Sequence, residues 1–559
     1  MSLKSVDIQK TLSLSSNDEQ KLSKNFTWTS LLGIAFSLTN SWLGVTSALV
    51  VGLYSGGPLL IIYGLIIGMF FTFMCGWSLA EFSSILPSSS GTSFWVLKML
   101  EKRDVELDGE YIGGDCILTS NVRTTEPYDD DDDDDEERRL ETFCATKEVR
   151  LNSSFQKSIA LIVGLINYFG SIFTTASVFS SLALSILGVH SLLHTQYQLA
   201  HWHVFLIYEI LNALFVVVNS WSSILPFISQ FGLYMSVLTY FFSFVVTIVC
   251  RSNYSSIEWP KTSEIFVDFK NTTGWSSAPM AFIVGLINPL WAFAGIDSAT
   301  HMVDDLGYKA SRKLVPLAIL TTITIGFLTS FTYAIGMFFC ITDVEKVTNS
   351  ILPILEIYYQ ATGNRNLSVL LQCCCILTGL TCASASVTWQ SRILWSVGRD
   401  FSQLVNGRRM AQRILLFFGT VNLSTKSPLN AHLFSQFCVA IIGCIFMGSS
   451  TAFNAIITAC ITLLLLSYAI PCVILLCVGK RSFYRRIKTE MASRNISDAS
   501  FPVQSKIGYV PTILTVAWAV FCLIFLSFPY TLPVTAQNMN YVSVVYAAVF
   551  MIIGAILCV

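Results

Sequence analysis

The chain has 559 residues, of which 53% are hydrophobic and only 12% are charged. A soluble domain usually carries about 25% charged residues, so the composition excludes an ordinary soluble protein and indicates a polytopic membrane protein. The formal net charge of −1 says nothing by itself about partners. We expect a lipid bilayer around the chain, a small-molecule substrate and no nucleic acid.

Apolar runs long enough to cross a bilayer recur along the whole chain. A helix of roughly 20 apolar residues spans the hydrocarbon core. We therefore predict an all-α polytopic fold with about twelve transmembrane helices. They lie near residues 31–54, 57–82, 156–187, 204–225, 230–250, 280–303, 314–341, 367–395, 430–448, 453–478, 508–529 and 541–559.

The distribution of basic residues predicts the orientation of these spans. With the N-terminus in the cytoplasm, 29 of the 34 Lys and Arg residues fall in inner segments, as the positive-inside rule requires. The first 25 residues contain no apolar core, so no cleavable signal peptide is expected. We expect a multi-pass protein of the plasma membrane, with the vacuolar membrane as the alternative.

Polar segments divide the chain. Residues 1–26 are predicted to be a disordered cytoplasmic N-terminus, and residues 27–559 the transporter domain. Within that domain, residues 101–150 form an acidic cytoplasmic insert that contains YDDDDDDDEERR (128–139). Like charges repel each other and stay solvated, which predicts a disordered loop. The alternative is that the N-terminus and the insert dock cytoplasmic regulators.

Three N-x-[ST] sequons fall in predicted outer loops and are candidate glycosylation sites. They are Asn253, Asn271 and Asn366. The cysteines lie mostly within spans and lack the spacing of metal ligands. We therefore expect no metal and no cofactor.

The sixth span contains residues that a simple membrane helix avoids. In GLINPLWAFAGIDSATHM (285–302), Pro289 follows Asn288 and removes a backbone donor. Gly295 adds flexibility near the middle. Unwound backbone is tolerated in a membrane where it lines a cavity, so a broken sixth helix that lines a substrate path is predicted.

The first span has a comparable interruption. In LTNSWLGVTS (38–47), Asn40, Ser41 and Gly44 weaken the helix at mid-depth. Paired broken spans indicate a transporter built from inverted repeats, here spans 1–5 and spans 6–10. Gly and Pro are common in membrane helices generally, so helix packing alone is the alternative explanation.

The same two segments hold groups that suit an organic cation. Asp297 places a negative charge in the sixth span, and an intramembrane acid is costly and usually functional. Trp42, Trp291 and Phe293 supply aromatic faces. Aromatic rings with a carboxylate bind quaternary ammonium groups, so we predict an amine or cation site. Ordinary packing of each aromatic residue is the alternative.

Three further ionisable residues have candidate roles. Glu209 in the fourth span and His301 in the sixth are candidate coupling sites for a proton or another cation, because imidazole titrates near neutral pH and membrane-embedded acids are costly. A hydrogen-bonded structural role is the alternative for both. Glu81, at the inner end of the second span, is a candidate gate contact or structural cap.

Several stretches resemble the amino acid–polyamine–organocation superfamily, specifically its amino acid/choline permease branch. Two of them are SLTNSWLGVTSALVVGLYSGGP (37–58) and AEFSSILPSSSGTSFWV (80–96). Four others resemble fungal choline permeases more closely: AFIVGLINPLWAFAGIDSATHM (281–302), SPLNAHL (427–433), SSTAFNAIITACITLLLLSYAIP (449–471) and SFPYTLPVTAQNMNYV (527–542). The likeness covers nearly all of residues 26–559 except the acidic insert.

The resemblance implies a LeuT-like fold, a 5+5 inverted repeat with substrate held between the first and sixth spans. The residues carried over to that site are Asn40, Ser41, Trp42, Gly44, Trp291, Phe293, Asp297 and His301. Relatives often have acids after the sixth span, so Asp304 and Asp305 are candidate gate residues. Relatives usually continue into a cytoplasmic tail, so the end at Val559 is expected to be truncated.

The function that the resemblance implies is a secondary active permease that imports a small organic cation or amine. Choline is the first candidate and ethanolamine the second. A permease for 4-aminobutyrate, another amino acid or thiamine is an alternative, as is a non-transporting nutrient receptor. No enzyme is expected, because the sequence has no phosphate-binding loop and no nucleophile–base motif in its large loops.

Overall fold

Helices provide almost all of the regular structure of this chain. The computed structural model describes residues 22, 24–47, 49–101, 132–143, 154–194, 196–254, 257–402, 409–497 and 508–558. Over these residues no strand occurs, and one isolated bridge joins Asn422 to Ser427. The predicted all-α fold is confirmed.

Eight helices in the described part of the chain are long and apolar enough to cross a membrane. They are α5 (Pro58–Ile85), α8 (Ser154–Leu193), α9 (His201–Val218), α10 (Leu225–Tyr254), α15 (Tyr308–Cys340), α18 (Arg365–Ser402), α20 (Leu429–Gly448) and α21 (Ser450–Val478). A bent first span adds a ninth. Shorter apolar helices occupy the predicted sixth span and the last two spans, α23 (Tyr509–Phe525) and α24 (Val542–Cys558). The predicted polytopic architecture is confirmed.

The first span is broken at Asn40. Helix α2 (Trp28–Thr39) ends there, because Asn40 adopts a left-handed conformation with φ of 35°, which side chains other than Asn and Asp rarely accept. Helix α3 (Ser41–Ser47) restarts immediately, and α4 (Leu49–Gly56) continues after a bend of 47°. The predicted interruption of the first span is confirmed.

The sixth span is broken over a longer stretch. Its parts are α12 (Ala278–Gly285), α13 (Ile287–Trp291), the 3-10 helix η2 (Ser298–Met302) and α14 (Val303–Leu306), with turns between α13 and η2. Pro289 has no N–H to donate within a helix. Gly295 has φ of 78°, a conformation that favours glycine. The predicted break in the sixth span is confirmed.

The two broken spans lie side by side, and one supplies a hydrogen-bond partner for a free backbone group of the other. The Asn288 side-chain Nδ2 donates to the Val45 carbonyl oxygen at 3.0 Å. A Cβ added at Gly44 would lie 3.3 Å from the Ala292 Cα, so only a glycine lets the two backbones approach this closely without adjustment. Freed backbone groups need such protein partners where water is absent.

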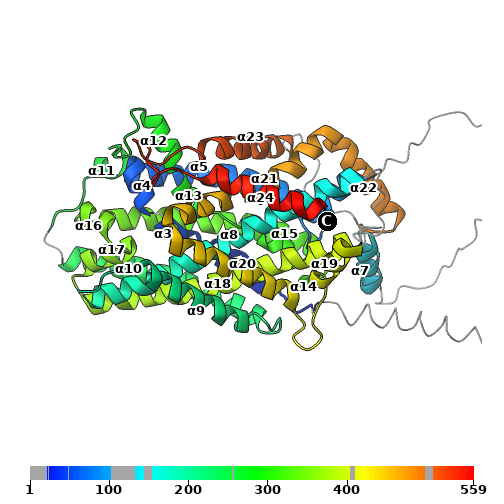
Figure 1. The fold of residues 1–559 in the computed structure, drawn as a ribbon, viewed down its shortest axis with the longest axis horizontal. Coiled ribbons are helices and arrows are strands. Elements are labelled where there is room, and N and C mark those ends of the chain that lie inside the picture. The colour runs from blue at the N-terminus through cyan, green and yellow to red at the C-terminus, as the bar shows by residue number, and fades with distance from the viewer. Residues whose placement is uncertain are drawn as a thin grey trace, which may run out of the picture.

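Long helices surround the broken spans. Helix α2 packs against α10, α15 and α18, while α8 packs against α18 and α21, and α5 against α15. The long helices run roughly along the longest axis of the molecule (Figure 1). The breaks at Asn40 and Gly295 are therefore enclosed by helices rather than exposed to lipid.

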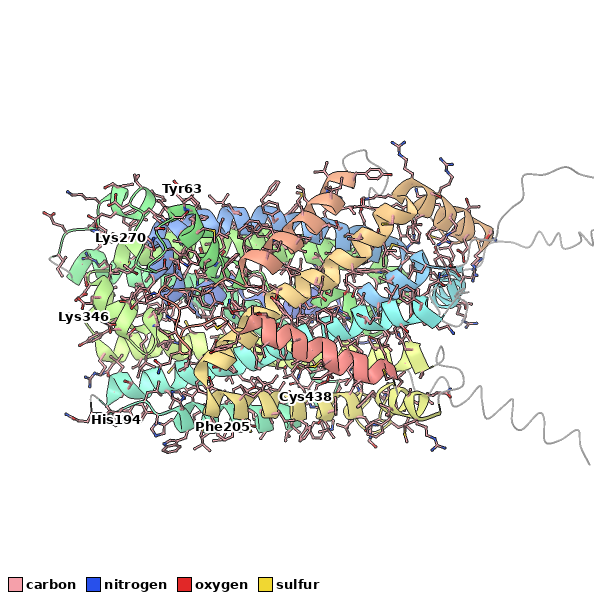
Figure 2. The ribbon with its side chains drawn as sticks, turned by 45° about the horizontal axis from the view of Figure 1, so that its top comes forward. Tyr63, His194, Phe205, Lys270, Lys346 and Cys438 are labelled. Atoms are coloured by element: carbon pink, nitrogen blue, oxygen red, sulfur yellow. The ribbon has the colours of Figure 1, made fainter. Side chains whose placement is uncertain are left out.

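The sides of the bundle are apolar, as a bilayer requires. On α10 the exposed apolar side chains recur every three or four residues: Tyr234, Leu238, Phe241, Val245 and Val249. Contiguous exposed apolar surface of this kind marks contact with a membrane or another protein. Charged side chains such as Lys270 and Lys346 lie instead at one end of the molecule (Figure 2).

The opposite end of the bundle carries α7 (Asp132–Phe143), α14, α19 (Arg409–Phe418) and α22 (Lys480–Ser493) (Figure 1). We call it the basic end, because Arg392 and Arg399 pair with acids of α14, and Lys480, Arg486 and Arg494 lie in or directly after α22. The other end carries α11 (Thr262–Phe266), α16 (Val344–Asn349) and α17 (Pro353–Thr362) (Figure 1). The predicted sequons lie near the end of α10 (Asn253), after α11 (Asn271) and at the start of α18 (Asn366). The use of the sequons and the membrane orientation stay predictions.

Part of the acidic insert is helical where the sequence predicts a disordered loop. Glu136 of α7 pairs with Lys309 at 3.1 Å and accepts a hydrogen bond from the Ser497 backbone N–H at 3.1 Å. Leu140 and Phe143 are buried. Apolar contacts and ion pairs at the basic end thus offset the repulsion within the run. Residues 1–21, 102–131 and 144–150 lie outside the described residues.

We predict that Gly33 is required for the contact between α2 and α10. An added Cβ there would lie 2.3 Å from the Ser229 carbonyl oxygen. Gly33→Ala should therefore lower the free energy of unfolding by about 1–3 kcal/mol, the usual cost of overpacking, measured as a lower melting temperature of the purified protein. Gly554→Ala on α24 is the control, since nothing lies within 4 Å of that position. Equal melting temperatures for both variants and the parent would contradict this packing.

Candidate substrate site

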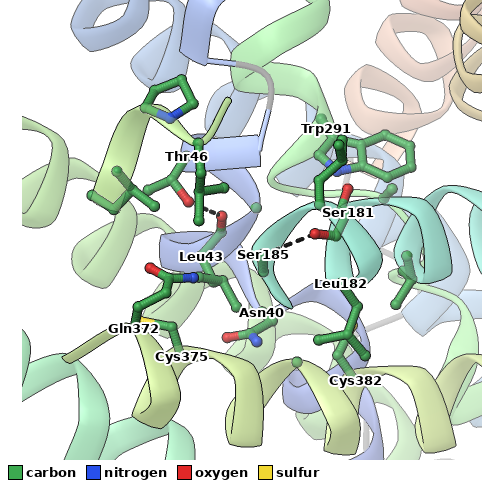
Figure 3. Close-up of a pocket in the computed structure, with 18 of the residues that line it drawn as sticks. Asn40, Leu43, Thr46, Ser181, Leu182, Ser185, Trp291, Gln372, Cys375 and Cys382 are labelled. Atoms are coloured by element: carbon green, nitrogen blue, oxygen red, sulfur yellow. Dashed lines mark hydrogen bonds between the residues drawn. The ribbon is translucent and has the colours of Figure 1, made fainter. Parts of the chain in front are cut away.

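A cavity of about 110 Å³ lies beside the break in the first span. Its walls come from the first span, α8, α18, residues 351–354 before and at the start of α17, and Trp291 of the sixth span (Figure 3). The polar side chains that line it are Thr39, Asn40, Thr46, Thr174, Ser181, Ser185 and Gln372. None of its lining residues carries a charge. This space is a candidate site for a substrate, and we call it the substrate cavity.

Asn40 brings an amide to the substrate cavity from the break itself. Its Oδ1 accepts a hydrogen bond from Ser236 Oγ at 3.0 Å. Its Nδ2 is buried and has no hydrogen-bond partner among the described residues. The bond to Ser236 therefore holds one side of the amide, and the other side is a buried donor at the substrate cavity.

Gln372 brings a second amide from α18, across the substrate cavity from α8 (Figure 3). The residue is 1% exposed, and its Oε1 has no hydrogen-bond partner in the described part of the chain. Cys375, Gly379 and Cys382 follow at helical spacing and line the same cavity. One face of α18 thus supplies a buried hydrogen-bond acceptor next to the small residues Cys375, Gly379 and Cys382.

Of the eight residues carried over to the substrate site, His301 is also a candidate coupling residue. The substrate cavity brings together three of the other seven: Asn40, Gly44 and Trp291. Trp42 is fully buried beside it, where its Nε1 donates to Ser236 Oγ at 3.0 Å and its ring packs edge-on against Tyr333. Ser41 points toward α15, since a Cβ added at Gly326 would lie 2.4 Å from its Oγ.

The other two predicted substrate residues lie outside the substrate cavity. Phe293 lines a separate cavity of about 30 Å³ next to Tyr468 and Trp518. Asp297 is 1% exposed and lines neither space. Its carboxylate accepts hydrogen bonds from Asn167 Nδ2 at 3.0 Å and from the Tyr468 hydroxyl at 2.7 Å, and it lies 3.1 Å from His301 Nε2.

The two candidate coupling residues have different surroundings. His301 belongs to the Asp297 cluster. Glu209 lies on α9 facing α20, where its Oε2 accepts a hydrogen bond from Asn212 Nδ2 at 3.3 Å. It lines neither cavity. The structure therefore brings His301, but not Glu209, into contact with the broken sixth span.

The three candidate gate residues all form ion pairs at the basic end. Arg392 of α18 donates to both carboxylate oxygens of Asp305, at 2.9 and 3.0 Å. Arg399 pairs with Asp304 at 2.9 Å. Glu81 pairs with Lys480. These contacts join the end of the sixth span to α18, and α5 to the α21–α22 junction, at the basic end.

Sequence reasoning missed Gln372, Asn167 and Tyr468. Each is a single polar group within an apolar run, as in LLQCCC around Gln372. A lone Gln or Asn inside a predicted span is the signal that could have found two of them, because buried amides need partners. Tyrosine gives no such signal, since its ring packs like any aromatic residue.

The geometry agrees with what comparison with known proteins shows. A model of the amino acid permease family matches residues 148–550. The chain belongs to the amino acid permease family. The superfamily predicted from the sequence motifs is thereby confirmed. The broken spans and the substrate cavity are parts of a membrane transporter.

Similar proteins from this family include two yeast transporters. The chain is 55% identical over 546 residues to the 7-keto 8-aminopelargonic acid transporter of Saccharomyces cerevisiae, covering 98% of this chain and 94% of that protein. It is 35% identical over 541 residues to the choline transporter of the same yeast, covering 96% and 82%. The resemblance to choline permeases is therefore confirmed, but the chain is more similar to the 7-keto 8-aminopelargonic acid transporter than to the choline transporter.

A solved structure also aligns along the whole chain. It is the manganese transporter of Eremococcus coleocola, with a TM-score of 0.47 and 12% sequence identity over 96% of this chain and 97% of that one.

We predict that Asp305 and Arg392 depend on each other. Their side chains are 2% and 1% exposed, and removing one partner of a buried pair typically costs about 3–5 kcal/mol. Asp305→Asn or Arg392→Gln alone should therefore lower the melting temperature strongly. The double variant should recover most of that loss, because it leaves no buried charge unpaired. A double variant that melts no higher than either single variant would refute the pairing.

Proposed function

We propose that this permease is a secondary transporter that imports a small solute with both an amine and a carboxylate, and that 7-keto 8-aminopelargonic acid is its first candidate. The observation that carries the proposal is the uncharged substrate cavity at the break of the first span. The identity of 55% to a transporter of that solute supports the choice.

The lining of the substrate cavity suits such a molecule. The solute has a carboxylate at one end of an apolar chain and an amino ketone at the other, so its net charge near neutral pH is close to zero. Asn40 Nδ2 can donate to a carboxylate, and Gln372 Oε1 can accept from an ammonium group. Leu43, Leu182 and Ile354 provide apolar surface for the chain between them.

Choline is the second candidate. The identity of 35% to a choline transporter and the presence of Trp291 in the wall of the substrate cavity favour it. A quaternary ammonium is bound best by several aromatic faces. In this alternative Asp297 with Trp42 or Trp291 holds the cation, as the sequence predicts, and the sixth span must rearrange to bring the carboxylate to the cavity.

Location and regulation are part of the same proposal. We place the protein in the plasma membrane with its basic end in the cytoplasm, because basic residues favour that side. Cytoplasmic regulators could then act on the transporter by binding α7, because Glu136 of α7 contacts both Lys309 of α15 and Ser497 after α22. A non-transporting receptor with the same fold is the alternative function.

The direct test is concentrative uptake by the full-length protein in a host without such transporters. Labelled 7-keto 8-aminopelargonic acid should accumulate and should be displaced by the unlabelled compound more strongly than by choline. Accumulation of choline alone would favour the second candidate. Binding of either solute without accumulation would favour a receptor and overturn the transport proposal.

We predict that Gln372 contributes directly to solute affinity. Gln372→Leu keeps the size of the side chain and removes the buried acceptor. A hydrogen bond to a charged group contributes about 1.5–3 kcal/mol, so at about 1.4 kcal/mol per decade the apparent affinity should fall by roughly tenfold or more in uptake assays. Leu370→Ala, on the lipid-facing side of the same helix, is the matched control. An unchanged affinity in Gln372→Leu would remove Gln372 from the site.

A further inference from the structure

Four polar side chains meet in a buried cluster apart from the substrate cavity. Asn167 comes from α8, Asp297 and His301 from the sixth span, and Tyr468 from α21. Each is at most 3% exposed. None of the four lines the substrate cavity, so the cluster needs an explanation of its own.

The hydrogen bonds around His301 define where its protons lie. Its Nδ1 is 2.6 Å from the Ser89 carbonyl oxygen. A carbonyl oxygen only accepts hydrogen bonds, so Nδ1 must carry a proton. The other ring nitrogen, Nε2, then faces Asp297 Oδ2 at 3.1 Å.

The contact between Nε2 and Oδ2 requires one more proton. A neutral imidazole protonated at Nδ1 has a lone pair on Nε2, and this lone pair would face the lone pairs of the carboxylate. The contact becomes favourable when a proton sits between the atoms, either on Nε2 or on Oδ2. In both arrangements the pair has no net charge, which suits a buried site.

The cluster can also tolerate the loss of that proton. Asn167 Nδ2 lies 3.0 Å from Asp297 Oδ2 and 3.3 Å from His301 Nε2, and its two N–H groups can donate to both. The Tyr468 hydroxyl donates to Asp297 Oδ1 at 2.7 Å. These donors stabilise the free carboxylate, while the repulsion between Oδ2 and Nε2 drives the ring away.

We infer that Asp297 and His301 form a proton-binding pair, and that its occupancy sets the position of η2 against the turn at residues 88–91. This inference rests on the proposed transport function and adds the coupling ion. It also assigns Asp297 to proton binding rather than to the solute.

The local backbone allows η2 to respond. Gly295, with φ of 78°, precedes it, and turns and η2 interrupt the sixth span between α13 and α14. A 3-10 segment that interrupts a span often marks a hinge. A Cβ added at Gly91 would lie 3.2 Å from His301 Cε1. The imidazole therefore packs directly on the turn, and neither can move without the other.

The turn transmits this movement to the basic end. The Asp304 backbone N–H donates to Ser89 Oγ at 3.0 Å, and Ser90 Oγ donates to the Asp400 carboxylate. Arg399 pairs with both Asp304 and Asp400. Loss of the proton would thus loosen the ion pairs of Arg399 with Asp304 and Asp400, which close the basic end.

The other ionisable groups on the elements packed around η2 have partners. Asp304, Asp305, Arg392, Arg399 and Asp400, on α14 and α18, pair with one another. On α15, Arg312 donates to the Ser84 and Ser497 carbonyl oxygens. On α5, Glu81 pairs with Lys480, and Cys75 is buried beside Tyr468. Helix α2 carries no ionisable side chain, and Tyr168 of α8 bonds to Ser435.

The test uses purified full-length protein in proteoliposomes, with 7-keto 8-aminopelargonic acid and choline as probes. Two assays are compared: exchange of labelled solute at equal pH, and accumulation driven by an inward proton gradient. Asp297→Asn and His301→Gln should retain exchange and lose gradient-driven accumulation. Glu209→Gln, which neutralises the carboxylate on α9, should accumulate solute like the parent.

Each outcome decides the inference. Accumulation that persists in both variants would overturn it, as would a parent that exchanges solute but ignores the proton gradient. Loss of exchange in a well-folded Asp297→Asn sample would assign Asp297 to the solute instead. Loss of coupling only in Glu209→Gln would move the proton site to α9.

If neither solute is exchanged, the proposed function is refuted, but the proton-binding pair is not. A second measurement tests the pair without any solute. Infrared difference spectra between low and high pH should contain carboxyl and imidazole bands from the pair in the parent. These bands should disappear in Asp297→Asn and persist in Glu209→Gln. Identical difference spectra for the parent and Asp297→Asn would overturn the proton-binding pair.

Discussion

The hydrogen bond from Asn288 to the Val45 carbonyl oxygen represents the constraint on which the rest of this structure depends. Inside a bilayer an interrupted helix must find protein partners for its free backbone groups. Two breaks placed side by side can supply them to each other, which requires Gly44 where the backbones touch. The same breaks leave Asn40 Nδ2 without a partner among the described residues, at the cavity where we propose that the solute binds.

Charge is separated from this cavity. The buried acids Asp297 and Asp305 lie instead in the Asp297 cluster and in an ion pair with Arg392 at the basic end. An unpaired charge is costly in the membrane, and pairing removes that cost only while the pairs stay closed. A transporter that opens at the basic end must break them, so the proposed proton pair at Asp297 and His301 stands where it can influence that opening.

Much of the fold could be predicted from the sequence, because span lengths and breaking residues are local properties. Asn40, Pro289 and Gly295 are residue types that weaken a helix, so their places in the sequence indicate where a span can break. The site could be predicted only in part, since side-chain direction depends on packing between distant segments. Trp42 turns to Ser236 and Tyr333, and Gln372 enters from a helix with no sequence signal of a break. Helix α7 shows the same limit, because its partners Lys309 and Ser497 lie far along the chain.

We propose that the cavity between the first span, α8 and α18 holds the transported solute. Cys382 lines this cavity, whereas Cys477 is exposed on α21. Alkylation of each cysteine by a small thiol reagent can be followed by mass spectrometry of the purified protein, with and without 7-keto 8-aminopelargonic acid or choline. The transported solute should slow the alkylation of Cys382 and should not change the rate of alkylation of Cys477. Equal modification of Cys382 with and without a solute that the protein transports would contradict the proposal.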